Sequence, residues 1–433
     1  MDKRKAGYVV GEVDTGSFIF VSDLEAFPPR LEYLVIPQVK ERTGDTFANV
    51  DVLAQVTRIV NYSDILGEKL SLHELETIIS RYSGNTKVYG EATILGYLSE
   101  QGEIRMPRSA SVPGQPVYVA PTDMLEQFFT RNIRAGIPVG GLITRDDVQV
   151  VLDPNGFRRH VAIIAQTGAG KSYLVGLILE QMLPLGATII VFDPNSDYVM
   201  MRRDPNGNPT LIAEDVAIYR PPGVKGRRFN DDEIGGAENY TVDFSKLEPE
   251  EIFGIAGISE NWVHIQKAVN DALEALDGIY GPEQLVAQLE VQANTKGREG
   301  VNSANALQHI RRLLSYRIWG QKNIPLDDLV RPRRISVIDL AGLQKRVSEY
   351  IVNKTLNEVW NKAVTGELEF PVFIVLEEAH SFAPAQGVGN ASSSRTIERI
   401  AAEGRKFGIF LTVVTQRPNK IKRARNIWMI WKE

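Results

Sequence analysis

The chain has 433 residues, and 43% of them are hydrophobic, which is enough apolar surface for the cores of two or three globular domains. Its formal net charge of −5 excludes a global basic field that would attract nucleic acid, although a basic channel can exist inside an acidic protein. The chain has no cysteine, and its five histidines lack H-x-x-x-H spacing, so disulfides and thiolate metal sites are excluded and a metal would need oxygen ligands.

The N-terminus shows no targeting segment, because the charged residues 2–5 are not followed by the apolar stretch of a signal peptide. No run in the chain approaches the roughly 18 consecutive apolar residues of a membrane span. We therefore expect a cytoplasmic protein that does not insert into a membrane.

Short β-like runs separated by turn residues fill the first 120 residues, and this spacing predicts a small barrel or a sandwich. A helix-like segment, Leu66–Tyr82, is expected as an insertion between them. Prolines at 107, 113, 116 and 121 then predict an edge and a linker, because proline is unsuited to central strands. The runs are Tyr8–Val10, Phe18–Val21, Tyr33–Ile36, Val52–Val56 and Ala92–Leu98.

From residue 140 onward, strand-like runs alternate with helical ones, which predicts an α/β fold with a parallel sheet covered on both faces. The strand-like runs are Ala187–Phe192, Ile335–Leu340, Val372–Leu376 and Ile409–Val414. Most of them lead directly into polar residues, at the carboxyl ends where such sheets place ligands. Periodic apolar residues between Leu247 and Leu329 indicate a helical subdomain inserted into the sheet.

Residues 165–172 are typical of a P-loop, because they join an apolar run to a helical pattern and follow G-x-x-x-x-G-K-[ST], with Ala165 in place of the first glycine. Lys171 is expected to reach the β- and γ-phosphates of ATP, and Ser172 to ligate Mg²⁺. A glycine-rich turn before an ordinary helix is the alternative. The residues expected to bind the nucleotide are Gln166, Thr167, Gly168, Ala169, Gly170, Lys171, Ser172 and Tyr173.

Two adjacent carboxylates, Glu377 and Glu378, end the apolar run that begins at Val372 and resemble a Walker B segment. Glu377 is expected to hold Mg²⁺, and Glu378 to orient and deprotonate the attacking water. Neighbouring side chains on a strand point to opposite faces, but both can face the P-loop if the backbone bends at the strand end. A solvated Glu-Glu pair at a strand end is the alternative.

Two further polar positions flank the last strand-like run. Arg405, with Lys406 as second choice, is a candidate arginine finger that stabilises charge on the γ-phosphate of a neighbouring subunit. The alternative is a helix C-terminus that favours cations through the helix dipole. Gln416 is a candidate γ-phosphate sensor, with a simple turn before Pro418 as the alternative.

Asp193, which ends another strand-like run, is a weaker candidate for the nucleotide or nucleic-acid site. Basic clusters at Arg311–Arg312 and Arg331–Arg334 could contact phosphates, but charged runs are more often solvated faces.

Together these motifs resemble the HerA family of ring-forming DNA translocases, in the HerA–FtsK branch of P-loop ATPases. The resemblance covers nearly the whole chain. The segments that carry it are Arg159–Val161 before the P-loop, Asp193–Tyr198, Ile338–Leu343, Leu376–Pro384, Ala402–Gly408 and Thr415–Pro418.

The resemblance implies a RecA-like P-loop NTPase core at 136–433 with a helical insertion at about 245–330, preceded by a HAS-type β-barrel with linker at 1–135. It implies a homo-hexameric ring with ATP and Mg²⁺ between subunits, double-stranded DNA in the central pore, and a NurA-type nuclease or other effector as partner. It also makes Lys171 and Ser172 phosphate and Mg²⁺ ligands, Glu378 the catalytic carboxylate and Arg405 the finger that acts on the next subunit.

The sequence departs from the family pattern at Ala165 and after Ile421. Residues 422–433 do not match the strand, helix and tail with which the family continues, so the chain is expected to be truncated or altered in reading frame there. An edge of the sheet and part of the ring interface would then be missing. Hydrolysis would be weakened while nucleotide binding survives.

The leading hypothesis is an ATP-driven DNA translocase or helicase that acts in DNA end processing or antiviral defence. One alternative is a related ring ATPase of the secretion or conjugation type. The other is a nucleotide-gated scaffold that assembles a partner effector.

Overall fold

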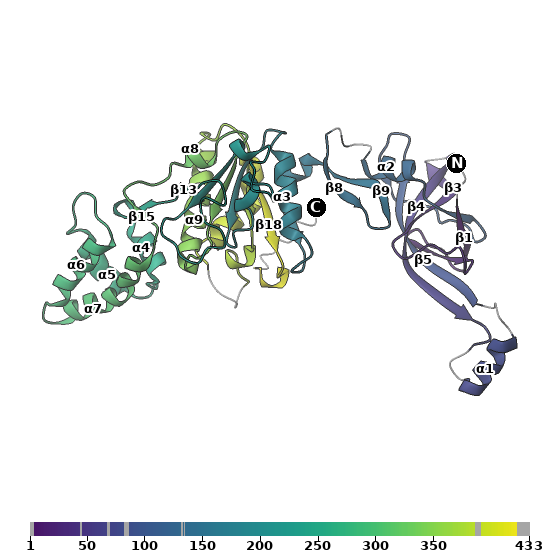
Figure 1. Ribbon diagram of the computed structural model, residues 1–433, viewed down its shortest axis with the longest axis horizontal. Helices are drawn as coiled ribbons and strands as arrows, with labels where there is room; N and C mark the ends of the chain where they lie inside the picture. Colours follow the sequence, from purple (N-terminus) through teal and green to yellow (C-terminus); the bar gives the residue numbers. More distant parts are fainter. Residues whose placement is uncertain are drawn as a thin grey trace. The chain divides into compact units, whose positions relative to one another are not determined.

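The protein is described here by a computed structural model. The described residues are 4–43, 46–66, 70–81, 86–130, 133, 135–385 and 391–421. The segment 422–433, where the sequence predicted a departure from the family pattern, lies outside them. The chain divides into two compact units, Met1–Asp153 and Pro154–Glu433 (Figure 1).

Six strands of the first unit close into a barrel. The hydrogen-bonding order is β2-β1-β7-β3-β4-β5, β5 pairs back to β2, and the short β6 extends β5. Alternation along β2 directs Phe18 and Phe20 into the barrel core, as expected for a sheet with one buried face. The strands are β1 (Lys5–Val10), β2 (Ser17–Ser22), β3 (Tyr33–Thr43), β4 (Thr46–Ser63), β5 (Thr86–Leu98), β6 (Ile104–Arg105) and β7 (Pro116–Val119).

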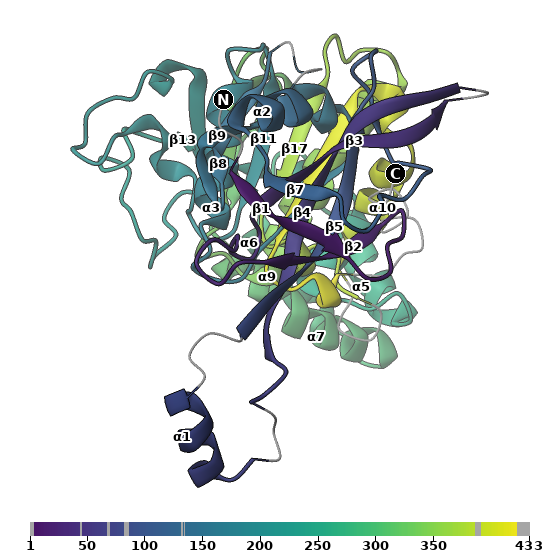
Figure 2. The ribbon, with the colours of Figure 1, turned by 90° about the vertical axis from the view of Figure 1, so that its right-hand side faces the viewer.

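The proline-rich region is not the edge that the sequence predicted. β7 lies between β1 and β3 inside the closed barrel. Pro116 is tolerated because it is the first residue of its strand, where its missing N–H costs least. Helix α1 (Leu72–Arg81) lies between β4 and β5, within the segment predicted as a helical insertion; Figure 2 shows it beyond the barrel strands.

A helix and a hairpin complete the first unit: α2 (Thr122–Thr130), β8 (Ile137–Leu142) and β9 (Arg145–Leu152). Leu125 and Phe128 of α2 pack with Val148 of β9 and with barrel residues in one apolar cluster. The compact unit therefore extends to Asp153, beyond residue 135.

The second unit is built on a seven-stranded parallel sheet with the order β10-β18-β17-β11-β16-β12-β13. Its strands are β10 (Val161–Ile164), β11 (Thr188–Asp193), β12 (Val216–Arg220), β13 (Glu238–Asn239), β16 (Ile335–Asp339), β17 (Val372–Leu376) and β18 (Ile409–Thr415). All the predicted runs are strands of this sheet. The two strands β12 and β13, which the sequence analysis did not predict, extend it at one side.

The helices of the second unit are α3 (Lys171–Met182), α4 (Pro249–Ala256), α5 (Val263–Leu273), α6 (Pro282–Ala293), α7 (Arg298–Ile310), α8 (Leu326–Leu329), α9 (Lys345–Val364) and α10 (Ser394–Glu403). Helices α4 to α8 occupy the predicted insertion, as does the short strand β15 (Trp319–Gly320), which pairs with β14 (Val242–Asp243) just before the insertion. Pro249 and Pro282 each open a helix, where proline lacks no needed donor.

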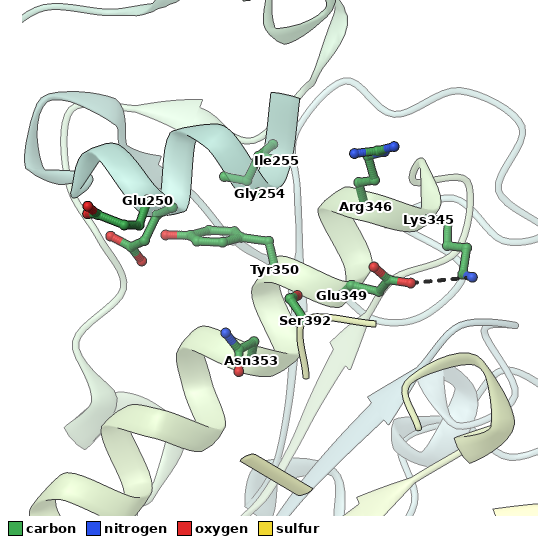
Figure 3. A pocket seen from close by; sticks show the side chains of 10 residues that line it. Glu250, Gly254, Ile255, Lys345, Arg346, Glu349, Tyr350, Asn353 and Ser392 are labelled. Atoms are coloured by element: carbon green, nitrogen blue, oxygen red, sulfur yellow. Dashed lines mark ion pairs between the residues drawn. The ribbon is translucent and has the colours of Figure 1, made fainter. Parts of the chain in front are cut away.

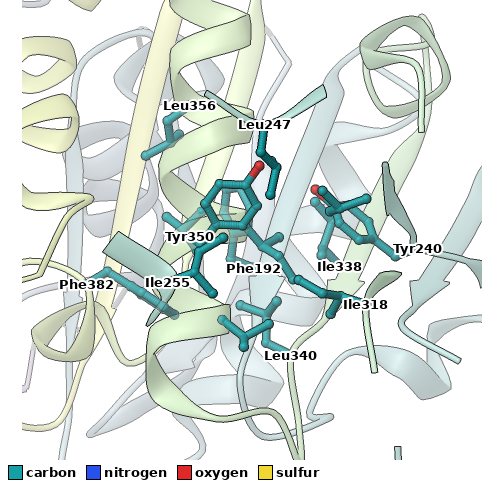
Figure 4. Packing of buried hydrophobic residues seen from close by; sticks show 14 of the residues in the cluster. Phe192, Tyr240, Leu247, Ile255, Ile318, Ile338, Leu340, Tyr350, Leu356 and Phe382 are labelled. Carbon is teal, nitrogen blue, oxygen red and sulfur yellow. The ribbon is translucent and has the colours of Figure 1, made fainter. Parts of the chain in front are cut away.

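One apolar core joins the sheet to the insertion. Phe192 of β11 and Ile338 of β16 pack in the same cluster as Tyr350 of α9 and Ile255 of α4 (Figure 4). The sheet is therefore held rigidly under the loops that follow its carboxyl ends. Among the residues that the structure describes, no helix combines the length and the apolar character that crossing a bilayer requires.

Candidate nucleotide site

The loop between β10 and α3 has the backbone of a phosphate-binding loop. Gly168 and Gly170 have φ angles of 82° and 79°, in the left-handed region that side chains disfavour. Ala165 does not adopt positive φ, so its methyl group is compatible with the loop. Tyr173, in the first turn of α3, is 81% exposed.

Lys171 lies between the two carboxylates of the predicted acidic motif. Its ammonium forms an ion pair with Glu377 and lies 3.7 Å from Glu378 Oε1. All three side chains are largely removed from solvent, with exposed fractions of 9%, 0% and 13%. A buried carboxylate pair is costly without a cation, so these residues depend on one another for stability as well as for chemistry.

The backbone bends at Glu378, as the sequence analysis expected. Its φ and ψ are 48° and 45°, a left-handed conformation unusual for a residue with a side chain. This bend follows the last residues of β17 and brings the carboxylates of Glu377 and Glu378 to the same side, facing Lys171. Strained backbone of this kind often occurs where a side chain must be aimed at a ligand.

Gln416 connects the P-loop to the acidic motif. Its Nε2 donates to Glu378 Oε1 at 3.1 Å, and its Oε1 accepts from the Thr167 hydroxyl. The residue follows β18, which lies between β10 and β17, so the sheet order itself places it between the two motifs. A side chain in this position can respond to a change at either one.

Asp193 is a structural residue. Its buried carboxylate accepts from the backbone N–H groups of Asn195, Asp197 and Tyr198 and so shapes the turn after β11. Burial raises the pKa of Asp193 to about 7, against the lowering effect of these hydrogen bonds.

The turn that Asp193 holds supplies two contacts that the sequence analysis did not assign to particular residues. Asp197 Oδ2 accepts from Ser172 Oγ at 2.9 Å, and the Tyr198 hydroxyl donates to Glu377 Oε2 at 2.5 Å. The signals in the sequence were the position of this turn after a buried strand and the place of Asp193–Tyr198 among the segments that resemble the HerA family.

His380 is a further neighbour of the acidic motif. Its Nδ1 lies 3.1 Å from Glu378 Oε2 and 3.3 Å from the Thr415 hydroxyl. Burial lowers the pKa of His380, although the Glu378 carboxylate opposes this effect. A neutral imidazole at neutral pH can position Glu378 without neutralising its charge.

Arg405 lies at the amino ends of the strands of this sheet, whereas the P-loop and the acidic motif lie at their carboxyl ends. It belongs to the short 3₁₀ helix η7 (Gly404–Phe407), which precedes β18, whereas Gln416 follows that strand. Burial, together with the nearby charge of Arg405, lowers the pKa of His160, the residue before β10, to about 4. The seven residues of β18 span about 20 Å, so Arg405 is remote from Glu378 of its own chain.

The donor atoms around the P-loop fit Mg²⁺, which prefers oxygen ligands. The Ser172 hydroxyl, the Glu377 carboxylate and the Asp197 carboxylate all lie at this site. Within the described part of the chain, no three His, Cys, Asp or Glu side chains form a metal-binding group.

The basic clusters are largely paired with acids. Arg311 pairs with Glu290 at 2.8 Å, Arg331 pairs with Asp328, and Arg334 lies 3.8 Å from Glu238. These pairs favour solvated faces over phosphate contacts at both clusters.

A cavity of about 500 Å³ lies apart from the P-loop, between α4 and α9 (Figure 3). Carboxylates and cations both line it, including the ion pair of Lys345 with Glu349 at 3.4 Å. Burial raises the pKa of Glu349. None of the predicted site residues reaches this cavity, so it is separate from the nucleotide site.

The chain is similar to several known proteins. The chain is 28% identical over 435 residues to a probable helicase of Methanocaldococcus jannaschii, covering 96% of this chain and 78% of that protein. It is 29% identical over 483 residues to the DNA double-strand break repair helicase HerA of Pyrococcus furiosus, covering 96% and 80%. Among solved structures, VirB4 of Thermoanaerobacter pseudethanolicus matches with a TM-score of 0.44 and 16% identity, over 66% of this chain and 78% of that one.

The family described as "Helicase HerA, central domain" matches residues 137–359, which is more than half of the chain. This span contains the P-loop, the turn after β11 and the helical insertion. The chain belongs to the HerA helicase family.

Proposed function

We propose that the protein is an ATP-driven translocase of double-stranded DNA that works as a hexameric ring, with a nuclease of the NurA type or another effector as its partner. The family supports the motor activity. The relative from Pyrococcus furiosus is named a DNA double-strand break repair helicase, which favours a role in DNA end processing.

The observation that carries the proposal is the position of Arg405 relative to Glu378. The carboxyl edge of the sheet holds the P-loop, the two carboxylates and Gln416, but no described arginine in contact with Lys171 or Glu378. Arg405 lies on the opposite edge and is exposed. In a head-to-tail ring, the edge of one subunit that bears Arg405 can face the nucleotide site of the next.

Within one site, we assign each charged or polar residue its own role in binding or hydrolysis. Lys171 would exchange its carboxylate partners for the β- and γ-phosphates of ATP, and the Ser172 hydroxyl, which here donates to Asp197, would be a ligand of Mg²⁺. Bound Mg²⁺ would offset phosphate charge. Glu378, held by Gln416 and His380, accepts the proton of the attacking water, and Arg405 of the neighbour stabilises charge on the γ-phosphate.

The direct test compares ATP turnover with and without double-stranded DNA, in the wild type and in Glu378→Gln. The substitution keeps the volume and the hydrogen bond to Gln416 but removes the base, so turnover should fall by about 100-fold or more while ATP still binds. Glu367→Gln is the matched control, because Glu367 is exposed in the loop before β17, remote from the P-loop.

DNA should stimulate turnover of the wild type and of the control. If DNA does not change ATP turnover, the proposed translocase activity is wrong. If Glu378→Gln keeps full activity, Glu378 is not the catalytic base. Lys171 is a less informative target, because its loss leaves two buried carboxylates unpaired and should also destabilise the fold.

A further inference from the structure

A second cavity, of about 350 Å³, lies at the carboxyl edge of the sheet beside β12 and β16. The loop segment 223–225 and the turn 342–344 line it, together with Ser315 and Arg317. Because β12 is five strands away from β10 in the sheet order, this cavity is about 24 Å from the P-loop. It is therefore not a part of the nucleotide site.

Only cations supply charge to the lining of this cavity. Lys225 and Arg317 both line it and are exposed, and no carboxylate lines it. In the described part of the chain, neither forms an ion pair. By contrast, Arg220 and Arg227 at the base of the same loop pair with acids: Arg220 Nε lies 2.7 Å and Arg227 Nε 3.7 Å from Asp339. The lining of this cavity is therefore positively charged although the chain has a net charge of −5.

The loop that carries Lys225 is held in one shape by its base. Arg220 Nη1 donates to the carbonyl of Phe229 at 3.1 Å, and Arg227 Nη2 donates to the carbonyl of Pro221 at 2.8 Å. A Cβ atom at Gly342 would lie 2.8 Å from Val224, so the loop packs tightly on the turn after β16. Such anchoring limits the entropy lost when Lys225 binds a ligand.

The same base is connected to the nucleotide site. Asp339, which holds Arg220, accepts from the Ser196 hydroxyl at 2.9 Å, and the adjacent Asp197 accepts from Ser172 of the P-loop. Ser196 has a φ of 58°, in the left-handed region, so the turn that joins the two sites is strained.

We propose that Lys225 and Arg317 form a binding site for phosphate groups of the DNA backbone. The site suits an anion, because it combines two cations with a glycine-rich backbone and has no acidic lining. A phosphate carries one negative charge and accepts hydrogen bonds from ammonium and guanidinium groups without regard to base sequence. The choice of DNA as the source of the phosphate rests on the proposed function.

The test measures binding of the full-length protein to a fluorescent DNA duplex over a range of salt concentrations. The double variant Lys225→Ala/Arg317→Ala should bind the duplex about tenfold more weakly, and the slope of log K against log salt should be smaller by about 2, because each lost phosphate contact removes ~0.9. Lys296→Ala is the control, since Lys296 is also exposed but lies in the helical insertion, and it should leave both values unchanged. ATP turnover without DNA should be equal in all three proteins.

Wild-type affinity and salt slope in the double variant would overturn the site while leaving the proposed function intact. Inorganic polyphosphate, as a second probe, tests the case in which the phosphate site exists but the proposed DNA translocase activity is wrong. If the wild type binds polyphosphate through Lys225 and Arg317 but does not bind the duplex, the phosphate site stands and the DNA translocase fails. If the double variant binds both probes as the wild type does, the site is wrong whatever the protein's function.

Discussion

At the scale of single residues, the candidate site is a set of charges that satisfy one another inside the protein. Lys171 is shared by Glu377 and Glu378, and Tyr198 donates to the far oxygen of Glu377. Lys171, Glu377 and Glu378 therefore already have protein partners before a nucleotide binds. When ATP binds, contacts with the nucleotide must therefore replace these contacts within the protein.

His160 should make the stability of the second unit depend on pH. Its ring is 5% exposed, its Nδ1 accepts from the backbone N–H of Leu411 at 3.1 Å, and burial lowers its pKa to about 4 from 6.5. The unfolded chain takes up a proton below pH 6.5 that the folded chain refuses until about pH 4. The stabilisation is thus fully present above pH 6.5 and lost as the pH falls through this window.

We expect the contribution of His160 to the free energy of unfolding of the second unit to fall by at most ~1.4 kcal/mol per pH unit, and by about 3 kcal/mol in total, between pH 6.5 and 4. Burial raises the pKa of Asp193 to about 7, so Asp193 titrates in the same window with the opposite sign, and the contribution of His160 is measured as the difference between the wild type and a variant without the imidazole. Urea unfolding followed by tryptophan fluorescence measures this unit alone, because all five tryptophans lie after residue 154. His160→Asn keeps an acceptor for Leu411 but does not titrate, so the wild type should lose about 3 kcal/mol of stability relative to this variant over the same window. An identical pH dependence in the variant would show that His160 is not the group responsible.

The sequence predicted the charged centre of the site because its chemistry follows from short motifs. Lys171, Glu377, Glu378 and Gln416 do lie together, whereas their roles in hydrolysis remain predictions. Asp197, Tyr198 and His380 could not be selected, because their contacts depend on which strands are neighbours in the sheet, and the sequence does not specify this.

At the scale of elements, the P-loop depends on its two left-handed glycines and not on the first position of its motif. A side chain at Gly170 would meet no atom within 4 Å, so a substitution there acts on the backbone alone. An L-residue in this conformation costs about 1–2 kcal/mol.

Gly170→Ala should therefore weaken ATP binding by about tenfold, and Ala165→Gly should change it by less than about twofold. A titration with a fluorescent ATP analogue measures both constants. Equal losses in the two variants would indicate that position 165 also requires a special backbone conformation. Unchanged affinity in Gly170→Ala would show that the conformation of Gly170 is not needed for binding.

Strands were predicted reliably from long apolar runs. Prediction was weaker where the neighbouring strands determine whether a segment forms a strand and where it lies in the sheet. The buried strands β11, β16, β17 and β18 were predicted within a residue or two at each end. β7 was mistaken for an edge because a single proline at a strand start looks the same in sequence as one that excludes a strand. The five-residue β12 was missed because short apolar runs lack a distinctive period.

At the scale of the whole molecule, the opposite edges of one sheet carry the two halves of the proposed catalytic site. A ring of such subunits would have every site completed by a neighbour, and no site would be complete in a monomer. Native mass spectrometry with ATP and Mg²⁺ should then show a hexamer, and a strictly monomeric protein would leave Arg405 without a site.

Mixing two inactive variants tests this arrangement. Glu378→Gln and Arg405→Ala should each hydrolyse ATP poorly alone. Equal amounts, mixed and reassembled, should recover about a quarter of wild-type turnover, because an intact Glu378 meets an intact Arg405 at about one interface in four. No recovery after verified subunit exchange would mean that Arg405 does not act across the interface.

The central claim is that ATP hydrolysis drives movement along DNA, and displacement of a triplex-forming strand measures it most directly. The wild-type protein should release the third strand from a duplex only when ATP and Mg²⁺ are present. The rate of release should rise with the rate of ATP turnover. Glu378→Gln should bind the same DNA and ATP without releasing the strand. Vigorous DNA-stimulated hydrolysis with no strand release, or equal release by Glu378→Gln, would contradict the account.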